Sequence, residues 1–535
     1  MTITRSNQIY IVLIQIIIFL VLGLRTLLNI VPFYFKYSDP AYEYLINGIN
    51  LIYGVAPGHA DHPGSTVQLT LSLTHRIYFA LAGKSMNIKS DFVEFPEQYA
   101  LTFSIFSILL HAITIYFITM KLYRIFQNIL YLFFPSIFII VGFNYFDQLT
   151  GIKPENFLIL ASGLLVYSLL YFELKDEPKN RLKPIIYGII LGIGVSTKVT
   201  FLLFTPVFFL VKGIKEKIIF SFTFSLTLLI LNIHLYGIFS YKWFVNIVFN
   251  GGRHGQEGNK NFSRILYDLK EITIFSYSSI FFLINLSFIL FLLNQKNKIL
   301  DIRELNIIKV NYLFVLLGLL LVVKESYARD FVIIIPFISL LLTVHISTIF
   351  KRCSLTKIPK LIFISILLPF ITITLMTITL LNTKNIITRN DTYALEGGRK
   401  VFEDFHKLNT EKGHIVISDY DAPTQFAALQ FGNVMYGESA VKEEVDKKYP
   451  TSLYIIADTV LNGKGEKIGC QLFSQFKIEN RKIFIFVRSP DEARSRLNSS
   501  VHGYNFVFSN NFLEFRESGL DWKIFEIVSA ECTNT

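Results

Sequence analysis

Two long apolar runs decide what this chain can fold into. Residues 9–24 (IYIVLIQIIIFLVLGL) and 361–381 (LIFISILLPFITITLMTITLL) approach or exceed the roughly 20 residues that a helix needs to cross a bilayer. Only 17% of the 535 residues are charged, whereas soluble domains average about a quarter. The first run is too long for the core of a signal peptide, and no small-residue cleavage site follows it. We therefore expect a polytopic α-helical membrane protein whose first apolar run is retained as an anchor.

Hydropathy predicts about eleven membrane-spanning segments, each near the usual length or slightly shorter. The fifth and the sixth are short and almost fused. The predicted segments lie near 9–32, 100–120, 127–145, 156–172, 184–197, 199–211, 218–236, 272–293, 310–323, 331–350 and 361–382.

The distribution of basic residues predicts the orientation of these segments. Cytoplasmic loops of membrane proteins collect Lys and Arg, and the basic connections here are 121–124, 173–183, 212–217, 294–305 and 351–360. With these inside, the outer side receives 33–99 as the first outer loop, then 146–155, 237–270, 324–330 and everything after 383. The net charge of +11 is then explained by topology, and we expect no nucleic-acid partner.

The last part of the chain has a different character. Short β-like runs occur at 414–420, 433–438, 452–458, 482–489 and 522–529, with helical stretches near 397–409 and 422–431. Strands that alternate with helices predict a small α/β domain. We therefore divide the chain into a membrane domain, 1–383, and an extracytoplasmic α/β domain, 384–535. Cys470 and Cys532 both fall in this domain; they either pair in an oxidising compartment or remain buried thiols.

Acidic residues follow the first apolar run directly. Asp39 precedes Pro40, which suits the first turn of a helix, so Ser38 or Asp39 could simply cap that helix. Glu43 lies four residues further on and would share the start of the same helix. The apolar positions Leu45, Ile49, Ile52 and Tyr53 suggest that this helix lies along the membrane surface. A carboxylate held at that interface suits the role of a general base.

The segment GHADHPG, residues 58–64, brings His59, Asp61 and His62 together. Three such residues could bind a metal, but their spacing fits none of the structural zinc patterns. A loop corner formed by the Pro-Gly pairs, presenting His62 to a substrate, is the preferred interpretation. Solvated loop residues without a function remain an alternative.

The second outer loop and the segment after it add further charges. Asp147, Lys153 and Glu155 lie in FDQLTGIKPENF; Lys153-Pro154-Glu155 could simply open the next helix, where an acid favours the helix dipole. Lys198 interrupts an apolar stretch at the outer boundary. It could extend harmlessly to the interface, but ionisable residues in membrane segments are functional candidates.

Two more outer connections are basic. KESYARDF contains Lys324 and Arg329, for which local charge balance with Glu325 and Asp330 is the simplest explanation. The glycine-rich stretch 250–260 contains Arg253 and His254 and is either a flexible loop or a cradle for phosphate through its backbone N–H groups.

These charges share the predicted outer side of the membrane. Cations from several loops at the depth of the membrane surface suit the phosphate of a membrane-embedded lipid such as a polyprenyl phosphate. Carboxylates at the same depth suit deprotonation of a hydroxyl or amine that accepts a sugar.

This arrangement resembles the glycosyltransferase C (GT-C) superfamily, and most of all the branch with protein O-mannosyltransferases and the bacterial aminoarabinose transferase of lipid A. Those enzymes have a catalytic Asp in the first outer loop, often within an Asp-Glu pair; Asp39 takes this position, with Pro40 in place of the adjacent acid. STKVTFLLF is similar to the family segment whose lysine faces the donor phosphate, which points to Lys198. ARDFVIIIP is similar to the late element RY-x-x-x-x-P, in which Arg329 and Pro336 match.

Other positions match the family less closely. Asp330-Phe331 replaces the usual tyrosine of the late element, DHPG is similar to a His-Pro segment of the first loop, and GGRHGQEG resembles a Gly-His-rich outer loop of bacterial members. The resemblance covers roughly residues 1–380 and depends on short motifs.

The resemblance implies inverting transfer of a sugar from a polyprenyl-phosphate donor to a lipid, glycan or protein acceptor outside a bacterial plasma membrane. Asp39 would be catalytic, and Lys198 and Arg329, with Lys324 or Arg253, would bind the donor phosphate. No cofactor is certain; some relatives use a divalent metal and others do not. The remaining candidates for substrate binding are Glu43, Asp61, His62, Asp147, Glu155 and His254.

Three other functions compete with this one. A transporter or flippase for lipid-linked sugars would have charges at mid-membrane and broken helices in paired repeats, and no paired repeat is found. A polymerase or ligase of lipid-linked glycans would use a larger donor. A non-catalytic scaffold would tolerate the loss of Asp39.

Overall fold

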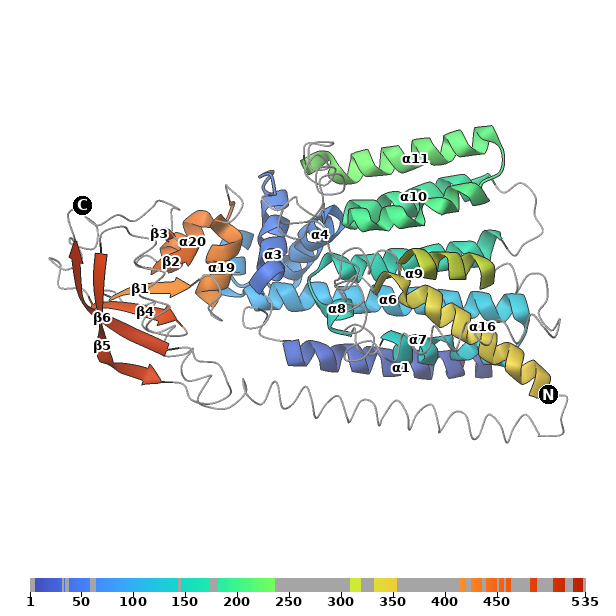
Figure 1. The fold of residues 1–535 in the computed structure, drawn as a ribbon, viewed down its shortest axis with the longest axis horizontal. Helices are drawn as coiled ribbons and strands as arrows, with labels where there is room; N and C mark the ends of the chain where they lie inside the picture. Colours follow the sequence, from blue (N-terminus) through green and yellow to red (C-terminus); the bar gives the residue numbers. More distant parts are fainter. Residues whose placement is uncertain are drawn as a thin grey trace, which may run out of the picture. The chain divides into compact units, whose positions relative to one another are not determined.

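The structure is a computed structural model, drawn in Figure 1. It describes residues 5–30, 33, 38–57, 64–142, 146–173, 181–235, 308–318, 332–353, 414–419, 425–434, 439–449, 452–456, 459–462, 482–487, 504–514 and 523–532. Contacts divide the chain into two compact units. The helical unit comprises Met1–Leu28, Ala60–Thr70 and Phe103–Leu375, and the mixed unit comprises Asn29–His59, Leu71–Thr102 and Met376–Thr535.

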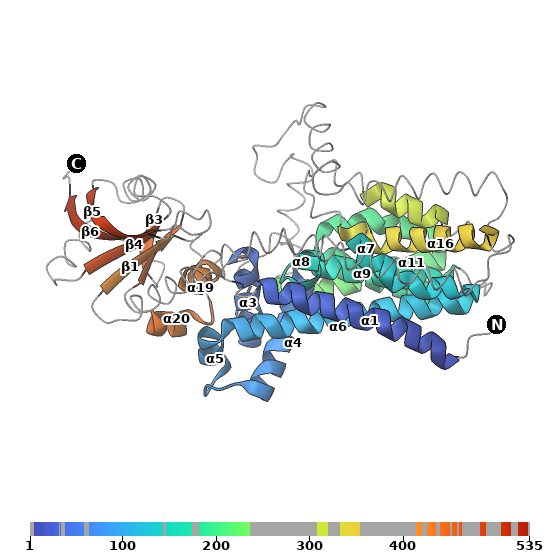
Figure 2. The ribbon, with the colours of Figure 1, turned by 90° about the horizontal axis from the view of Figure 1, so that it is seen from below.

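Helices make up the described part of the helical unit, where they lie lengthwise beside one another (Figures 1 and 2). Among the described residues, three stretches are long and apolar enough to cross a membrane: Asn7–Leu28, Pro96–Phe126 and Pro154–Phe172. This supports a helical protein associated with a membrane. The elements are α1 (Arg5–Ile30), α6 (Pro96–Phe126), η1 (Ile129–Phe133), α7 (Phe134–Gly142), α8 (Phe146–Thr150), α9 (Pro154–Phe172), α10 (Leu182–Thr197), η3 (Val199–Leu210), α11 (Ile214–Asn232), η4 (Ile233–Leu235) and α16 (Ile335–Cys353).

Several of the predicted spans correspond to shorter apolar helices. These are Ile129–Gly142, Leu182–Thr197, Val199–Leu210, Ile308–Gly318 and Val332–Ser347. The predicted spans 272–293 and 361–382 lie outside the described residues. The full number of spans, about eleven, therefore stays a prediction.

Gln15 shows how a buried polar side chain is satisfied within these helices, as an apolar environment requires. Gln15 of α1 is 3% exposed. Its amide nitrogen donates to the carbonyl oxygen of Leu132 at 2.9 Å, and its amide oxygen accepts from the hydroxyl of Ser136 at 2.7 Å. One residue thereby ties α1 to the chain at η1 and α7.

Helices α10 and α11 approach closely through small residues. An ideal Cβ built on Gly192 would lie 2.7 Å from Cβ of Thr227, and one on Gly188 would collide with Oγ1 of Thr223. Gly188 and Gly192 form a G-x-x-x-G pattern, which brings helix backbones together in membrane proteins. This pairing was not anticipated from the sequence, although both glycines are visible in YGIILGIG.

The close packing predicts that Gly192→Leu destabilises the helical unit. Real Cβ contacts are never as short as 2.7 Å, so the β-branched Thr227 or a whole helix must shift, at a cost of about 1–3 kcal/mol. Thermal unfolding of the detergent-purified protein measures the effect. The matched control is Ile189→Leu, on the same helix but 38% exposed; equal melting temperatures for the two variants would contradict the packing.

The C-terminal part of the mixed unit contains a six-stranded sheet with the order β3-β2-β1-β4-β6-β5. β1 pairs in parallel with both β2 and β4, and the remaining pairs are antiparallel. Ile, Val and Phe dominate these strands, as expected for a pleated surface. The strands are β1 (His414–Asp419), β2 (Ser452–Ile456), β3 (Thr459–Asn462), β4 (Lys482–Val487), β5 (Tyr504–Glu514) and β6 (Lys523–Cys532).

Four predicted strands coincide with β1, β2, β4 and β6. The strand expected at 433–438 is wrong at its start, because Asn433 and Val434 belong to helix α19 (Gln425–Val434). This helix and α20 (Lys442–Lys448) lie in the connection between β1 and β2, where a parallel pair needs a long crossover. The domain boundary near 383, the helix at 397–409 and Cys470 lie outside the described residues, so the boundary and the disulfide stay predictions.

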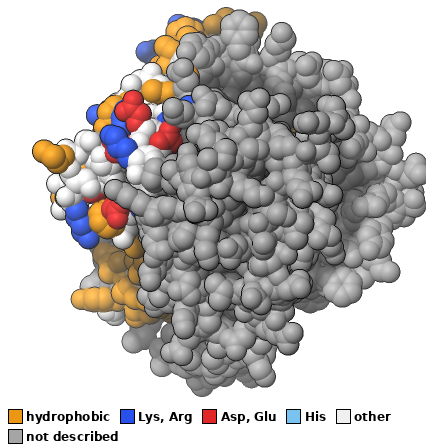
Figure 3. Space-filling view, turned by 90° about the vertical axis from the view of Figure 1, so that its left-hand side faces the viewer, with side chains coloured by type: hydrophobic (Ala, Val, Ile, Leu, Met, Phe, Trp, Pro, Cys, Tyr) orange, Lys and Arg blue, Asp and Glu red, His pale blue; other side chains and the backbone are white. Residues whose placement is uncertain are grey.

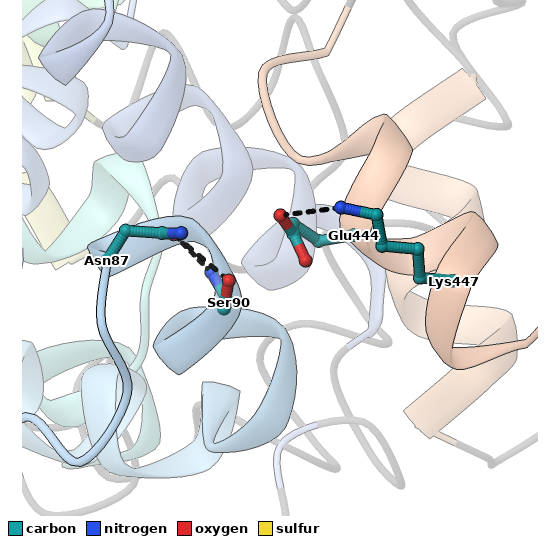
Figure 4. A network of polar contacts seen from close by, with 4 residues as sticks. All are labelled: Asn87, Ser90, Glu444 and Lys447. Atoms are coloured by element: carbon teal, nitrogen blue, oxygen red, sulfur yellow. Dashed lines mark hydrogen bonds and ion pairs between the residues drawn. The ribbon is translucent and has the colours of Figure 1, made fainter.

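Helices of the first predicted outer loop pack against α19 and α20. α3 (Ser38–Ile52) packs against α19, and α5 (Ile88–Glu94) packs against α20. The part of α4 (Ser65–Ala82) after Thr70 lies against α3. The amide of Ala440 donates to the side chain of Asn50 at 2.8 Å, and Lys448 forms an ion pair with Glu94 at 3.2 Å. Figure 4 shows the N-cap of α5, Asn87, facing the α20 pair Glu444–Lys447.

The prediction that the apolar side of α3 lies on the membrane surface is wrong for Leu45 and Ile49. Leu45 and Ile49 are 0% exposed. Gly48 allows α4 to approach, since a Cβ there would lie 2.8 Å from Cβ of Leu71. Gly432 of α19 likewise sits against the carbonyl of Tyr42, at 2.8 Å from an ideal Cβ. Other parts of the protein therefore cover these two positions, whereas Tyr53, just after the helix, is 42% exposed.

Candidate functional site

Lys198 lies at the junction between two helices, α10 and η3. It ends α10 and begins η3 in an extended conformation, with φ −156° and ψ 132°. Its amide still donates to the carbonyl of Gly194, and its carbonyl accepts from Phe201, both at 3.0 Å. The ring of Phe201 packs directly on Gly194. One extended residue thus separates two short apolar helices without leaving its own backbone groups unpaired.

The side chain of Lys198 is buried in an ion pair. Nζ lies 3.1 Å from Oε1 of Glu155, and the two side chains are 5% and 6% exposed. The alternative in which Lys198 extends to the membrane interface is therefore wrong. Glu155 occupies the first turn of α9, after Pro154, where the helix dipole also favours a carboxylate. Burying either charge alone would cost several kcal/mol, and the pair avoids this cost because the two charges compensate each other.

Polar side chains at the ends of three helices, α4, α10 and α11, lie close to this junction in the structure. Thr197 shares a hydroxyl hydrogen bond of 2.6 Å with Thr66, and its carbonyl accepts from the amide of Gly64 at 3.1 Å. Asn232, at the end of α11, donates to Ser196 at 2.9 Å and accepts from the hydroxyl of Ser65. We call the following residues the helix-end cluster: Ser65, Thr66, Glu155, Ser196, Thr197, Lys198 and Asn232.

The start of α9, and with it Glu155, is anchored to α6. The side-chain oxygen of Asn156 accepts from the hydroxyl of Ser107 at 2.6 Å and from Nε2 of His111 at 2.8 Å. Its amide nitrogen donates to the carbonyl of Gly151 at 3.1 Å. Asn156 was not singled out in the sequence, because an Asn near a helix start is common and its partners on α6 are 45 or more residues away.

Asp147 lies nearby in the chain, on α8, and is half-buried. Its carboxylate accepts from the side-chain amide of Gln148 at 2.8 Å, and that residue's oxygen in turn accepts from Lys153 at 3.5 Å. The polar side chains of the second predicted outer loop therefore form a local network beside the start of α9.

Asp39 and Glu43 of the first loop belong to the mixed unit. The backbone of Asp39 lies in the first turn of α3, as predicted, and its side chain lies outside the described part of the structure. Glu43, one turn later, is 2% exposed. Lys198 belongs to the helical unit, so a single site that combines it with Asp39 stays a prediction.

Glu97 is an acid that the sequence analysis missed. Its carboxylate accepts from the hydroxyl of Tyr42 at 2.7 Å and from the amide of Phe33 at 2.6 Å. It thereby holds the chain entering α3 and the first turns of α3 itself. A Pro-Glu pair predicts the N-terminus of a helix. It gives no indication of partners so far away in the sequence.

Six candidate residues lie outside the described residues and remain predictions: Asp61, His62, Arg253, His254, Lys324 and Arg329. Within the ranges that the structure describes, no group of three or more His, Cys, Asp or Glu side chains could hold a metal ion. The question of a divalent metal near His59, Asp61 and His62 therefore stays open.

His75 is a second residue that the sequence analysis missed. It is 0% exposed on α4, packed against the rings of Phe92 and Tyr99 at centroid distances of 5.8 and 5.1 Å. Its Nε2 lies 3.1 Å from the carbonyl oxygen of Leu45 and must donate to it, which places the proton on Nε2. Burial lowers the pKa of His75 to about 4, so the ring is neutral at pH 7.

Comparison with known protein families and with curated proteins finds no match to this chain.

The ion pair predicts a non-additive effect on stability. Lys198→Met or Glu155→Gln alone leaves one buried charge uncompensated and should cost about 3–5 kcal/mol of unfolding free energy, whereas the double variant should recover most of it. Unfolding in a denaturant series measures all three. The matched control is Lys183→Met, which breaks a Lys–Glu pair of 2.8 Å with side chains 18% and 24% exposed, and should cost about 1 kcal/mol or less. Additive losses would contradict the coupling.

The burial of His75 predicts acid sensitivity. The pKa is about 4 in the folded state and about 6.5 in the unfolded state, so the unfolded state binds more protons between these values. Stability should therefore fall as the pH decreases from about 6.5 through about 4, by at most about 3 kcal/mol from this residue. His75→Gln cannot titrate and should show a shallower decrease in unfolding experiments at pH 7, 5.5 and 4.5; identical slopes would contradict the assignment.

Proposed function

We propose that the protein is an integral-membrane inverting glycosyltransferase that moves a sugar from a polyprenyl-phosphate donor to an extracytoplasmic lipid, glycan or protein acceptor. The observation that supports it best is the Lys198–Glu155 pair within the helix-end cluster. A buried ammonium on a residue whose neighbours in the cluster have hydroxyl and amide side chains suits the binding of a phosphate, since all of these groups can donate to its oxygens.

The proposed chemistry is a single displacement. The carboxylate of Asp39 takes the proton of the acceptor hydroxyl, and the acceptor oxygen bonds to the anomeric carbon as the bond between that carbon and the phosphate oxygen breaks. The polyprenyl phosphate leaves with the bonding electrons, and Lys198 stabilises the negative charge that develops on it. Arg329, Lys324 and Arg253 are further candidates for this role, and Glu43 and Asp147 for binding the substrate.

The proposal includes a location and a topology. The basic connections are cytoplasmic, about eleven segments cross a bacterial plasma membrane, and the α/β domain after 383 is extracytoplasmic. The extended backbone and buried side chain of Lys198, between α10 and η3, support this placement. Irregular backbone and a buried charge occur in membrane proteins where they line a functional cavity.

One observation favours a second candidate, a transporter of lipid-linked sugars. Helices α10 and η3 are 16 and 12 residues long and meet at a buried lysine. Each extends about 24 Å at the usual rise per residue, which is shorter than the roughly 30 Å of hydrocarbon that a spanning helix crosses. Discontinuous helices of this kind form substrate sites in transporters.

The test is the release of sugar from a panel of radiolabelled polyprenyl-phosphate sugars by membranes that contain the wild type, Asp39→Asn, Lys198→Met or the control Lys183→Met. We expect the wild type and the control to consume one donor. Asp39→Asn should be slower by about a hundredfold or more, as expected for the loss of a general base. Membrane extraction and gel filtration show whether each variant is folded.

The result that contradicts the proposal is equal activity of Asp39→Asn and the wild type. If the wild type consumes no donor but moves a lipid-linked sugar across proteoliposomes, with Lys198→Met inactive, the transporter is the correct function.

A further inference from the structure

One face of α4 is apolar and uncovered. Leu73, Ile77 and Leu81 are spaced four residues apart, so they form a single stripe along the helix. They are 51%, 40% and 82% exposed. The helix contains no Asp or Glu, and its only exposed charge is Arg76. A soluble surface rarely has an acid-free helix with such a stripe.

The opposite face of α4 is already used for packing. Leu71 and His75 are 0% exposed, the first against Gly48 and the second against Leu45, both on α3. The stripe is therefore not the core-facing side of the helix. It is also distinct from the spans, because α4 is not among the three described helices that are long and apolar enough to cross a membrane.

The stripe continues into an ordered loop with Met86 at its tip, 102% exposed. The buried carboxylate of Asp91 accepts from the amides of Lys84 and Ser85 at 2.6 and 2.8 Å, and from the hydroxyl of Tyr99 at 2.8 Å. Asn87 caps α5 through the amide of Ser90 at 2.9 Å (Figure 4). These bonds hold the methionine outside the protein, where it has no apolar partner of its own.

The exposed charges of α4 and of the loop after it are positive. Arg76 and Lys84 are exposed, and Nζ of Lys89 lies 4.1 Å above the ring of the exposed Tyr53. The only acids between residues 65 and 95 are Asp91, which is buried in the bonds just described, and Glu94, which pairs with Lys448. Figure 3 shows apolar, basic and acidic side chains side by side on the described surface of one face of the molecule.

The chain itself keeps this segment near a membrane. Residues 31–95 connect two stretches that can cross a membrane, Asn7–Leu28 and Pro96–Phe126. Only Phe95 separates the end of α5 from the start of α6. Two consecutive spans leave their connection on one side of the bilayer, so α4 and the loop after it lie on the same side of the membrane.

We propose that the α4 stripe and Met86 insert into the leaflet that faces residues 31–95. Leu73, Ile77, Leu81 and Met86 enter the boundary between head groups and acyl chains, and the basic side chains bind the phosphates of anionic lipids. Leu45 and Ile49 of α3, by contrast, are buried in the protein. The inference does not depend on the proposed transferase activity.

The test uses the full chain in nanodiscs, in a background with the three native cysteines replaced by serine. Single cysteines are introduced by Leu73→Cys, Ile77→Cys, Leu81→Cys or Met86→Cys, and by Glu443→Cys as the control on an exposed position of α20. A spin label on each reports collisions with oxygen, which is enriched in lipid, and with a nickel chelate, which stays in water. We expect the ratio of oxygen to nickel collisions to be severalfold higher at the four stripe positions than at Glu443.

The contribution of charge is tested with Arg76→Gln and Lys84→Gln. Each should lower the ratio at Met86 in nanodiscs with anionic phosphatidylglycerol and leave it unchanged in pure phosphatidylcholine. Nickel collisions at the stripe equal to those at Glu443 would overturn the proposal in favour of a water-exposed helix. Protection from both reagents would overturn it in favour of a covering protein.

A second measurement tests the proposal if one of the cysteine variants fails to fold. Leu81→Trp keeps a large apolar side chain at the most exposed stripe position, and its fluorescence should be quenched by brominated lipids more strongly than that of the wild type. No additional quenching would contradict insertion.

Discussion

The ion pair of Lys198 with Glu155 is the interaction on which the polar end of the helical unit depends. A buried ammonium requires a nearby anion, and this requirement sets where α9 must begin. The anchoring of Asn156 to α6 holds that helix start, and the extended backbone of Lys198 allows the side chain to leave the helix while both of its backbone groups remain bonded. The hydroxyl groups of Thr66 and Thr197 and the amide of Asn232 then face one another at the ends of α4, α10 and α11.

Much of the helical framework could be predicted from the sequence because apolar runs are local features. The break at Lys198 was visible as one charge between two apolar stretches, and the start of α3 as a Ser-Asp-Pro sequence. The partner of Lys198 could not be identified, because Glu155 is 43 residues away. Glu97 and His75 were missed for the same reason: their roles come from partners on other helices and not from their neighbours in the chain.

The expectation for α3 failed for a physical reason that also applies to other amphipathic helices. An apolar stripe on a helix predicts that something covers it, and the pattern is the same whether that is lipid or protein. Here glycines contribute to the outcome, since Gly48 lets α4 approach α3 and Gly432 lets α19 approach Tyr42 and Ile46 of α3. α4 is the opposite case, with a stripe that its own protein leaves uncovered.

The bond between Ala440 and Asn50 joins residues 390 positions apart, and this has a consequence for biosynthesis. At roughly 5–20 residues per second, the ribosome needs about 20–80 s to make the segment that completes the packing of α3. During that time the apolar residues that later lie beneath α19, including Ile46 and Tyr42, have only part of their final contacts. The first loop is thus one of the first parts of the chain to be synthesised and one of the last to mature, and a nascent chain released early would expose this surface to the quality-control proteases of the cell.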